Sequence, residues 1–372
     1  MYHRSRLLCL RVIRHGLTRP QGGTPIDQSL MDSQLESQFM CRALRKPCLT
    51  FSVMTLAGLN ACAGQGPPQS QPSEFWGFTG PWETASTQSV RAHGGQLDAV
   101  INGWITIDSA SALPVIPSPY LDTVRPLNGT PRRMAIVTSW HGDGFHTASI
   151  RLLGRDPDRL AKTAGAIGKY SQSMRYSGLV LDFESLTAAD LPVLVRVSKA
   201  IADSARARGV RTIAMAIPAT DAEGYPARPL LGAVDALVVM LYDQHWDTSE
   251  PGPIAEPSWV RSALQRRVAE AGAARLIAAL PAYGYRWRKG SPTESIGYAQ
   301  AVTMANAAGA PLTRDEQSRT LRSRDASGNE IWVADAGLLR ALVDQSLSLG
   351  VNRIAIWRLG QEDPAIWRTV IR

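Results

Sequence analysis

Short apolar segments alternate along most of the chain with longer segments in which apolar residues recur at helical spacing. Many of the short segments are apolar at successive positions, which is typical of strands buried on both faces in a parallel sheet. The clearest helical pattern carries Leu191, Leu194 and Val197 and ends near Gly209. The alternation of strand and helix predicts a (β/α)8 TIM barrel over residues 74–372. The eight predicted strands are 75–78, 97–101, 134–138, 176–184, 212–217, 236–241, 276–280 and 353–357.

Two further patterns refine this prediction. Thr187 and Asp190 resemble the ends of a capping box in which Asp takes the place of Glu, so we expect a helix to begin there. About 45 residues separate Tyr285 from Trp332 without a strong strand signal, which is long for a βα connection. We therefore expect a small insertion between strands seven and eight, with some structure of its own.

The chain before the predicted barrel has the composition of a leader. A basic stretch at residues 40–46 precedes a largely apolar stretch at 47–59, which is too short for a membrane span of ~20 residues. A Leu-Asn-Ala-Cys sequence ending at Cys62 follows. It resembles the lipobox of bacterial lipoproteins, in which the cysteine is acylated, although an ordinary signal peptide with a chance cysteine stays open.

These features predict a lipoprotein at the bacterial cell envelope. Acylated Cys62 would anchor the chain to a membrane, which we expect to be the outer membrane on its periplasmic side. The segments so predicted are 1–39 as an extension upstream of a true start at Met40, 40–61 as the lipoprotein signal peptide, and 62–73 as a flexible linker.

The distribution of charge and of cysteine along the chain bears on its partners and on metal binding. Of a formal net charge of +8, residues 1–61 carry +5, so the predicted barrel has no basic stripe. A nucleic-acid partner is therefore not expected. No cysteine follows residue 62, which excludes a disulfide or a cysteine-based metal site within the barrel. The cysteines are Cys9, Cys41, Cys48 and Cys62.

Acidic and aromatic residues follow several predicted strands. Because the carboxyl ends of parallel strands meet at one rim of a barrel, we expect these side chains to lie close together. Aromatic faces beside carboxylates suit a sugar. Simpler interpretations stay open, with Trp357 as core and Tyr242-Asp243 as a turn. The candidates are Asp182 and Glu184 after strand four, Tyr242, Asp243 and Gln244 after strand six, Tyr283 and Trp287 after strand seven, Trp357 in strand eight, and Trp82 and Trp140 after strands one and three.

Four motifs lie in order at these strand ends. Residues 177–184 read Ser-Gly-Leu-Val-Leu-Asp-Phe-Glu, and 240–243 read Met-Leu-Tyr-Asp. Residues 280–284 read Leu-Pro-Ala-Tyr-Gly, and 356–364 read Ile-Trp-Arg-Leu-Gly-Gln-Glu-Asp-Pro. They resemble the Asp-x-x-Asp-x-Asp-x-Glu, Met-x-Tyr-Asp, Leu-Pro-x-Tyr-Gly and Trp-x-Leu-Gly-x-Glu-Asp motifs of glycoside hydrolase family 18, the chitinases and endo-β-N-acetylglucosaminidases. The resemblance spans residues 76–367 and is strongest to the bacterial branch with spore-cortex and peptidoglycan N-acetylglucosaminidases.

The resemblance implies hydrolysis of β-1,4-linked N-acetylglucosamine polymers with retention, assisted by the substrate, without a cofactor or metal. Glu184 would be the general acid and base, and Asp182 would orient the acetamide. Tyr242 and Asp243 would hold the acetamide from the other side. The resemblance further implies sugar contacts at Trp357 as the floor and at Tyr283 and Trp287 as walls, and we add Trp82, Trp140 and Gln244 as further candidates.

The chain departs from the family motif at Ser177 and Val180, where the family has aspartates. Val180 deprives Asp182 of a carboxylate neighbour and replaces it with an apolar one, so we expect the pKa of Asp182 to be raised. The departure also supports an alternative function, a weakly active or inactive chitinase-like lipoprotein that binds glycan.

Some features are left open by the sequence. Residues 141–146 contain two histidines and an aspartate, but the glycines between them favour a surface loop over a metal site. The polymer could be chitin, peptidoglycan or poly-N-acetylglucosamine, and the sequence does not distinguish endo from exo action.

Overall fold

The computed structural model describes residues 71–80, 82–115, 131–142 and 144–371. The predicted upstream extension, the signal peptide, Cys62 and most of the predicted linker at 62–73 lie outside the described residues. Within the described part of the chain, no helix has the length and apolar character needed to cross a membrane.

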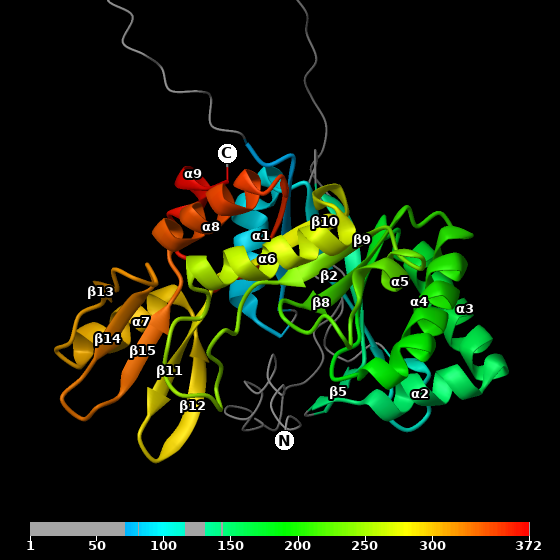
Figure 1. Cartoon of the computed structure of the whole chain (residues 1–372), viewed down its shortest axis with the longest axis horizontal. Helices are drawn as coiled ribbons and strands as arrows, with labels where there is room; N and C mark the ends of the chain where they lie inside the picture. The colour runs from blue at the N-terminus through cyan, green and yellow to red at the C-terminus, as the bar shows by residue number, and fades with distance from the viewer. Residues whose placement is uncertain (1–70, 81, 116–130, 143, 372) are drawn as a thin grey trace, which may run out of the picture. The chain divides into compact units, whose positions relative to one another are not determined.

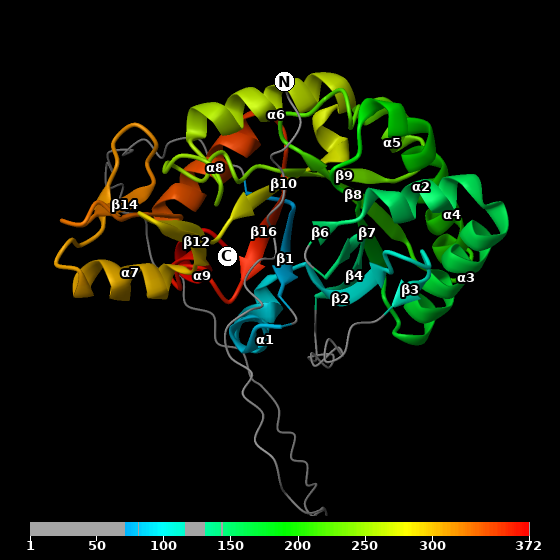
Figure 2. The same ribbon diagram turned by 90° about the horizontal axis from the view of Figure 1, so that it is seen from below.

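The sheet that organises the chain is a closed ring of parallel strands (Figure 1). Each strand pairs in parallel with its neighbours, and β1 pairs with both β16 and β2, which closes the ring. Figure 2 shows this ring with helices around it. The predicted (β/α)8 barrel is confirmed. Its strands are β1 (Glu74–Thr79), β2 (Ala99–Ile107), β4 (Arg132–Thr138), β7 (Gly178–Asp182), β8 (Thr212–Pro218), β9 (Ala236–Met240), β10 (Leu276–Pro281) and β16 (Arg353–Leu359).

The predicted ends of the second and fourth strands were wrong. The second strand was predicted to end at residue 101, but β2 continues past Trp104 to Ile107 because every residue of the strand is buried. The polar residue Asn102 and the glycine after it obscured this run, and the pairing of β2 with β4 is irregular at that point. The fourth strand is shorter than predicted, so Glu184 lies just beyond the end of β7.

The helices cover the outside of the ring. The predicted helix after the fourth strand is confirmed as α4, which buries Leu194 and Val197. The predicted capping box at Thr187 and Asp190 is formed, and it caps the 3-10 turn that leads into α4. The helices of the barrel are α1 (Thr84–His93), α2 (Thr147–Arg155), α3 (Pro157–Ser173), α4 (Leu191–Arg206), α5 (Ala227–Leu231), α6 (Pro257–Ala271), α8 (Ala336–Ser348) and α9 (Ile366–Thr369), with the 3-10 turns Gly94–Gln96, Ala188–Asp190 and Ala273–Arg275.

The predicted insertion is a five-stranded antiparallel sheet with one helix between β10 and α8. It has a small core of its own around Ile296, Ile331 and Val333. At Gly284 a Cβ atom would lie 2.0 Å from the backbone oxygen of Trp332, so a glycine is needed where the chain enters this sheet. Its elements are β11 (Gly284–Arg288), β12 (Ser291–Ile296), α7 (Tyr298–Ala307), β13 (Thr313–Arg314), β14 (Leu321–Arg324) and β15 (Glu330–Val333).

Short strands also extend two barrel loops near the carboxyl ends of β2 and β4. Strand β3 (Pro114–Val115) pairs antiparallel with β2. Strands β5 (Trp140–His141) and β6 (Gly144–Phe145) form a small hairpin directly after β4.

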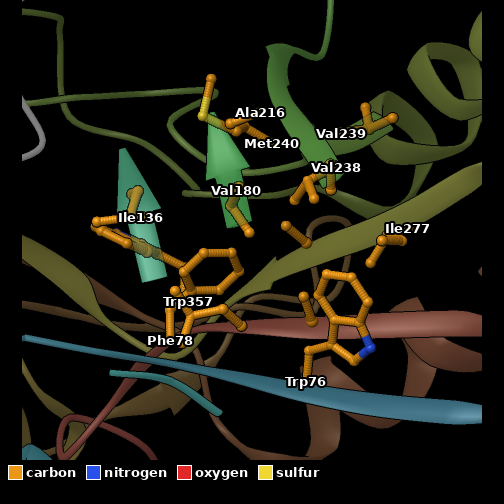
Figure 3. Packing of buried hydrophobic residues seen from close by; sticks show 14 of the residues in the cluster. Trp76, Phe78, Ile136, Val180, Ala216, Val238, Val239, Met240, Ile277 and Trp357 are labelled. Atoms are coloured by element: carbon orange, nitrogen blue, oxygen red, sulfur yellow. The ribbon is translucent and has the colours of Figure 1, made fainter. Parts of the chain in front are cut away.

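The inside of the barrel is filled by apolar side chains. Figure 3 shows Phe78, Ile136, Val180 and Trp357, from β1, β4, β7 and β16, gathered around one centre. Trp76 lies among the same cluster and is fully buried. Because the interior is a packed core and not a pore, polar chemistry can begin only where this packing stops, at the ends of the strands.

The turn that leads into α4 is held by a buried carboxylate, that of Asp190. The Asp190 carboxylate accepts hydrogen bonds from the Thr187 N–H at 3.0 Å and from two Arg151 nitrogens at 2.7 and 2.8 Å. These bonds, those from Arg151 above all, hold the pKa of Asp190 well below its usual range.

We predict that Asp190→Ala lowers the free energy of unfolding by about 1–2 kcal/mol at neutral pH, because the 3-10 turn that leads into α4 loses its capping box. A depressed pKa stabilises the fold only where the carboxyl is ionised, so the difference from wild type should narrow as the pH falls below about 4. Urea denaturation across pH measures this. Asp344→Ala, which removes an exposed pair with Arg340, is the control and should cost about 0.5 kcal/mol or less. Equal losses in the two variants would contradict the assignment.

Candidate active site

The candidate residues gather where the strands end. Asp182 is the last residue of β7, and Glu184 follows it by two positions. Tyr242 and Asp243 follow β9, Tyr283 follows β10, and Trp357 lies within β16. Because all these strands run parallel in one closed ring, their carboxyl ends share one rim.

The carboxyl group of Asp182 is buried at this rim, with 8% of the residue exposed. It lies opposite Thr138 in the pairing of β4 with β7, and it is hydrogen-bonded by the Thr138 hydroxyl and by Glu184. Loss of solvent dominates over these bonds and raises the pKa of Asp182 to about 6. The direction agrees with the expectation drawn from Val180, which is fully buried two positions earlier.

A hydrogen bond joins the side chains of Asp182 and Glu184. Two carboxyl groups can share a hydrogen bond only when one of them carries a proton. The bond with Glu184 favours the ionised form of Asp182, but burial outweighs it, so that the pKa of Asp182 is raised overall. Glu184 is half-buried and follows the strand, where it is open to a ligand. The pair thus places one buried and one half-buried carboxyl group side by side at the end of β7.

Aromatic rings lie across the rim from this pair. The rings of Tyr242 and Trp357 are stacked, with 6.3 Å between centroids and 15° between planes. Tyr283 meets Tyr242 edge-on at 6.2 Å, and Phe78 meets Trp357 at 5.6 Å. Trp357 therefore packs with the core through Phe78 and with Tyr242 at the rim. The sequence left a core position and a position at the site as alternatives for Trp357, and the two positions are compatible.

Asp243 fixes two of the tyrosines. Its carboxylate accepts hydrogen bonds from the hydroxyls of Tyr283 and Tyr285, the latter at 3.0 Å. The backbone of Asp243 is left-handed, with φ of 56°, a conformation that aspartate tolerates in turns. Tyr285 was not predicted from the sequence, because it comes from β11 of the insertion and only the fold brings it to Asp243.

Two further candidates hold loops. The indole nitrogen of Trp287 donates to the backbone oxygen of Ser249 at 3.1 Å. The side-chain oxygen of Gln244 accepts the N–H of Glu256 at 2.7 Å, which ties down the connection from β9 to α6. Contact of Trp287 and Gln244 with sugar stays a prediction.

Trp82 and Trp140 lie at the barrel rim on the side of β1, β2 and β4. Trp82 is half-buried and meets Trp104 edge-on at 5.1 Å. Trp140 is buried against Phe145 at 5.1 Å. Sugar contacts of these two rings also stay predictions. Sequence reasoning missed Arg358, which pairs with Glu83 and lies 5.5 Å over the ring of Trp82.

The histidine segment after β4 forms the hairpin of β5 and β6. Within it, His146 Nε2 donates to the backbone oxygen of His141 at 2.6 Å, and Ser109 Oγ lies 2.9 Å from His141 Nδ1. Among the residues that the structure describes, which leave out residue 143, no three potential ligands converge on a common point as a metal would need.

The raised pKa of Asp182 has a consequence for stability. The folded chain binds the proton of Asp182 more tightly than the unfolded chain, whose aspartates titrate near 3.8. The contribution of this group to stability is therefore highest below pH 4 and is lost as the pH rises toward 6. We predict that Asp182→Asn is stabilised relative to wild type across that range, by on the order of 2 kcal/mol. Thermal unfolding from pH 4 to 7 tests this, and parallel curves for the two proteins would refute it.

Comparisons with known proteins agree with this geometry. No protein-family model matches the chain. Over 240 residues the chain is 25% identical to a Bacillus subtilis protein named sporulation-specific glycosylase YdhD, a match that covers 61% of this chain and 57% of that protein. The chain therefore spans less than two thirds of that relative's length.

Solved structures show the same fold. The spore cortex-lytic enzyme SleL of Bacillus cereus superposes with a TM-score of 0.70 at 18% identity, covering 80% of this chain and 74% of that one. A chitinase of Chromobacterium violaceum superposes with a TM-score of 0.69 at 20% identity, covering 80% and 97%. In its barrel and in its sequence relatives, the chain thus resembles the chitinase-like glycosidases of glycoside hydrolase family 18, as its motifs indicated.

Proposed function

We propose that the chain is a glycoside hydrolase that cleaves β-1,4-linked polymers containing N-acetylglucosamine. The glycosylases and chitinases that it resembles support a glycosidase in general. The observation that carries the specific proposal is the hydrogen-bonded pair of Asp182 and Glu184 at the end of β7, with the Asp182 carboxyl buried and Glu184 half-buried at the rim. This is the arrangement needed by a general acid next to a group that stabilises positive charge.

The proposed reaction has two steps. In the first, Glu184 gives its proton to the glycosidic oxygen while the carbonyl oxygen of the substrate's own acetamide attacks the anomeric carbon. The bond to the leaving sugar breaks and an oxazolinium ion forms, stabilised by ionised Asp182 against the acetamide nitrogen. In the second, Glu184 takes a proton from water, and the hydroxide opens the oxazolinium ion with net retention.

The aromatic side of the rim would hold the sugar. The ring of Trp357 offers a flat apolar surface for the C–H face of the sugar in the cleaved position. The Tyr242 hydroxyl would hold the acetamide from the side opposite Asp182. Asp243, by accepting from Tyr283 and Tyr285, keeps these rings in place without rearrangement when the substrate binds.

Peptidoglycan is the polymer that the comparisons favour. The relative YdhD is named a sporulation-specific glycosylase, and the structural neighbour SleL is named a spore cortex-lytic enzyme. The similar chitinase structure makes chitin the second candidate. Both polymers contain β-1,4-linked N-acetylglucosamine, so one site chemistry serves either.

A specific observation favours a second function. Val180 is fully buried where the family motif has a carboxylate, so Asp182 has no second aspartate with which to share charge. A barrel that binds glycan without cleaving it would be consistent with this loss. Turnover and binding assays distinguish the two functions.

We predict that Glu184→Gln lowers hydrolysis of peptidoglycan or chitooligosaccharides by about 10²–10⁴-fold, because the variant cannot donate a proton. Products are identified by mass spectrometry, and glycan retention is followed by pull-down. Glu316→Gln, which alters an exposed glutamate of the insertion, is the matched control and should behave as wild type. Intact substrate with the wild-type chain, together with glycan retained by both proteins, would establish the binding function instead.

We further propose that Cys62 is acylated and anchors the chain at the cell envelope. The lipobox-like sequence before it is the support for this proposal. Expression of the whole chain in a bacterium should yield a membrane-associated protein that incorporates labelled palmitate, and Cys62→Ala should abolish the label. Equal labelling of the variant, or none in the wild type, would contradict the proposal.

A further inference from the structure

A single side chain holds the backbone on both sides of Glu184. The hydroxyl of Tyr225 donates to the carbonyl oxygen of Phe183 at 2.7 Å and accepts the N–H of Leu186 at 3.1 Å. Tyr225 is 1% exposed and lies in the loop between β8 and α5. The Tyr225 hydroxyl, from the loop that follows β8, therefore bonds to the backbone before Glu184 and after Ser185.

The segment between these two bonds has an unusual backbone. Ser185 is left-handed, with φ of 64°, which residues other than glycine adopt only where their surroundings impose it. The side chain of Ser185 is exposed. The hydrogen bonds that Tyr225 makes with Phe183 and Leu186 hold the backbone on either side of this segment. If the hydroxyl is lost, the segment can relax, and the carboxyl of Glu184 moves with it.

Tyr225 is itself held by a buried arginine of α6. Arg267 is 1% exposed and donates to the backbone oxygens of Tyr225 at 2.9 Å, Pro218 at 2.7 Å and Asp221 at 2.8 Å. Its charge is balanced by Glu270 at 3.0 Å. Pro218 ends β8, so Arg267 joins the strand end, the loop and Tyr225 into one unit.

We propose that Tyr225 is a positioning residue for the general acid Glu184, and that Arg267 fixes the loop that carries it. The inference rests on the proposed function, because it assigns a role within that reaction. Three carbonyl groups converging on one buried guanidinium, and a hydroxyl bridging two backbone groups beside the acid, form a continuous set of contacts from α6 to Glu184.

The hydroxyl of Tyr225 is a reliable donor in this position. Burial raises the pKa of Tyr225 far above its usual value, and the nearby carboxylates of Glu184, Asp221 and Asp182 raise it further. The hydroxyl therefore keeps its proton at neutral pH. Tyr225 does not transfer a proton to substrate, and its effect acts only through the placement of Glu184.

The leaving group of the substrate provides the test. An unactivated sugar leaves only if it is protonated, whereas the nitrophenolate of a 4-nitrophenyl β-chitobioside leaves without help. A misplaced acid should therefore slow the first substrate and spare the second. We compare kcat/KM, which reports the steps up to the first irreversible one, for chitohexaose or peptidoglycan strands and for the nitrophenyl glycoside.

We predict that Tyr225→Phe lowers kcat/KM on the unactivated glycan by about 10- to 100-fold, with the loss mainly in kcat. On the nitrophenyl glycoside the expected loss is within about threefold. Arg267→Lys keeps the charge but cannot bridge three carbonyls, so it should show the same selective loss. It serves as the second variant should Tyr225→Phe fail to fold, as judged by circular dichroism.

Tyr176→Phe is the matched control, because Tyr176 is also a buried tyrosine but lies before β7, at the opposite end of that strand from Glu184. Its kcat/KM ratio for the two substrates should equal that of wild type. Equal losses on both substrates in Tyr225→Phe and Arg267→Lys, or no loss in either, would overturn the inference. A wild-type chain that cleaves neither substrate would instead overturn the proposed function.

Discussion

Closure of the parallel sheet is the constraint on which the rest of this structure depends. Strand β1 pairs with both β2 and β16, and this double pairing turns an open sheet into a ring. Side chains pack closely against β1 at Gly77, where a Cβ atom would lie 2.6 Å from the Leu359 side chain and 2.9 Å from the Leu97 side chain. Closure brings the ends of β7, β9, β10 and β16 to one rim, so that residues far apart in sequence form one site.

The site begins where the packed interior stops. Val180 and Ile136 occupy an apolar layer of the barrel, and the next pair along the same strands is Asp182 and Thr138. The carboxyl of Asp182 is therefore buried against apolar packing on one side and meets polar partners on the other. Burial raises its pKa, and a hydrogen bond joins it to Glu184, the residue that the proposed reaction uses as an acid.

Much of the fold was predictable because the barrel strands are continuous apolar runs and the helices have regular spacing. The acidic and aromatic candidates were predictable for the same reason, since strand ends in a closed parallel ring must meet. The insertion was predicted only as structured, because strands such as β13 and β14 are short and largely polar. Tyr225 and Tyr285 were missed because each acts through a tertiary contact, one from a loop and one from the insertion, that leaves no pattern in the sequence.

The central claim is that the acetamide of the substrate is the nucleophile beside Asp182 and Glu184. It is tested most directly with aryl β-glycosides of N-acetylglucosamine whose acetyl group carries no, one, two or three fluorine atoms. Fluorine withdraws electron density from the acetamide oxygen, so kcat/KM should fall steeply and continuously along the series. A rate that does not change with fluorination would contradict the account, because it would mean that another group attacks the anomeric carbon.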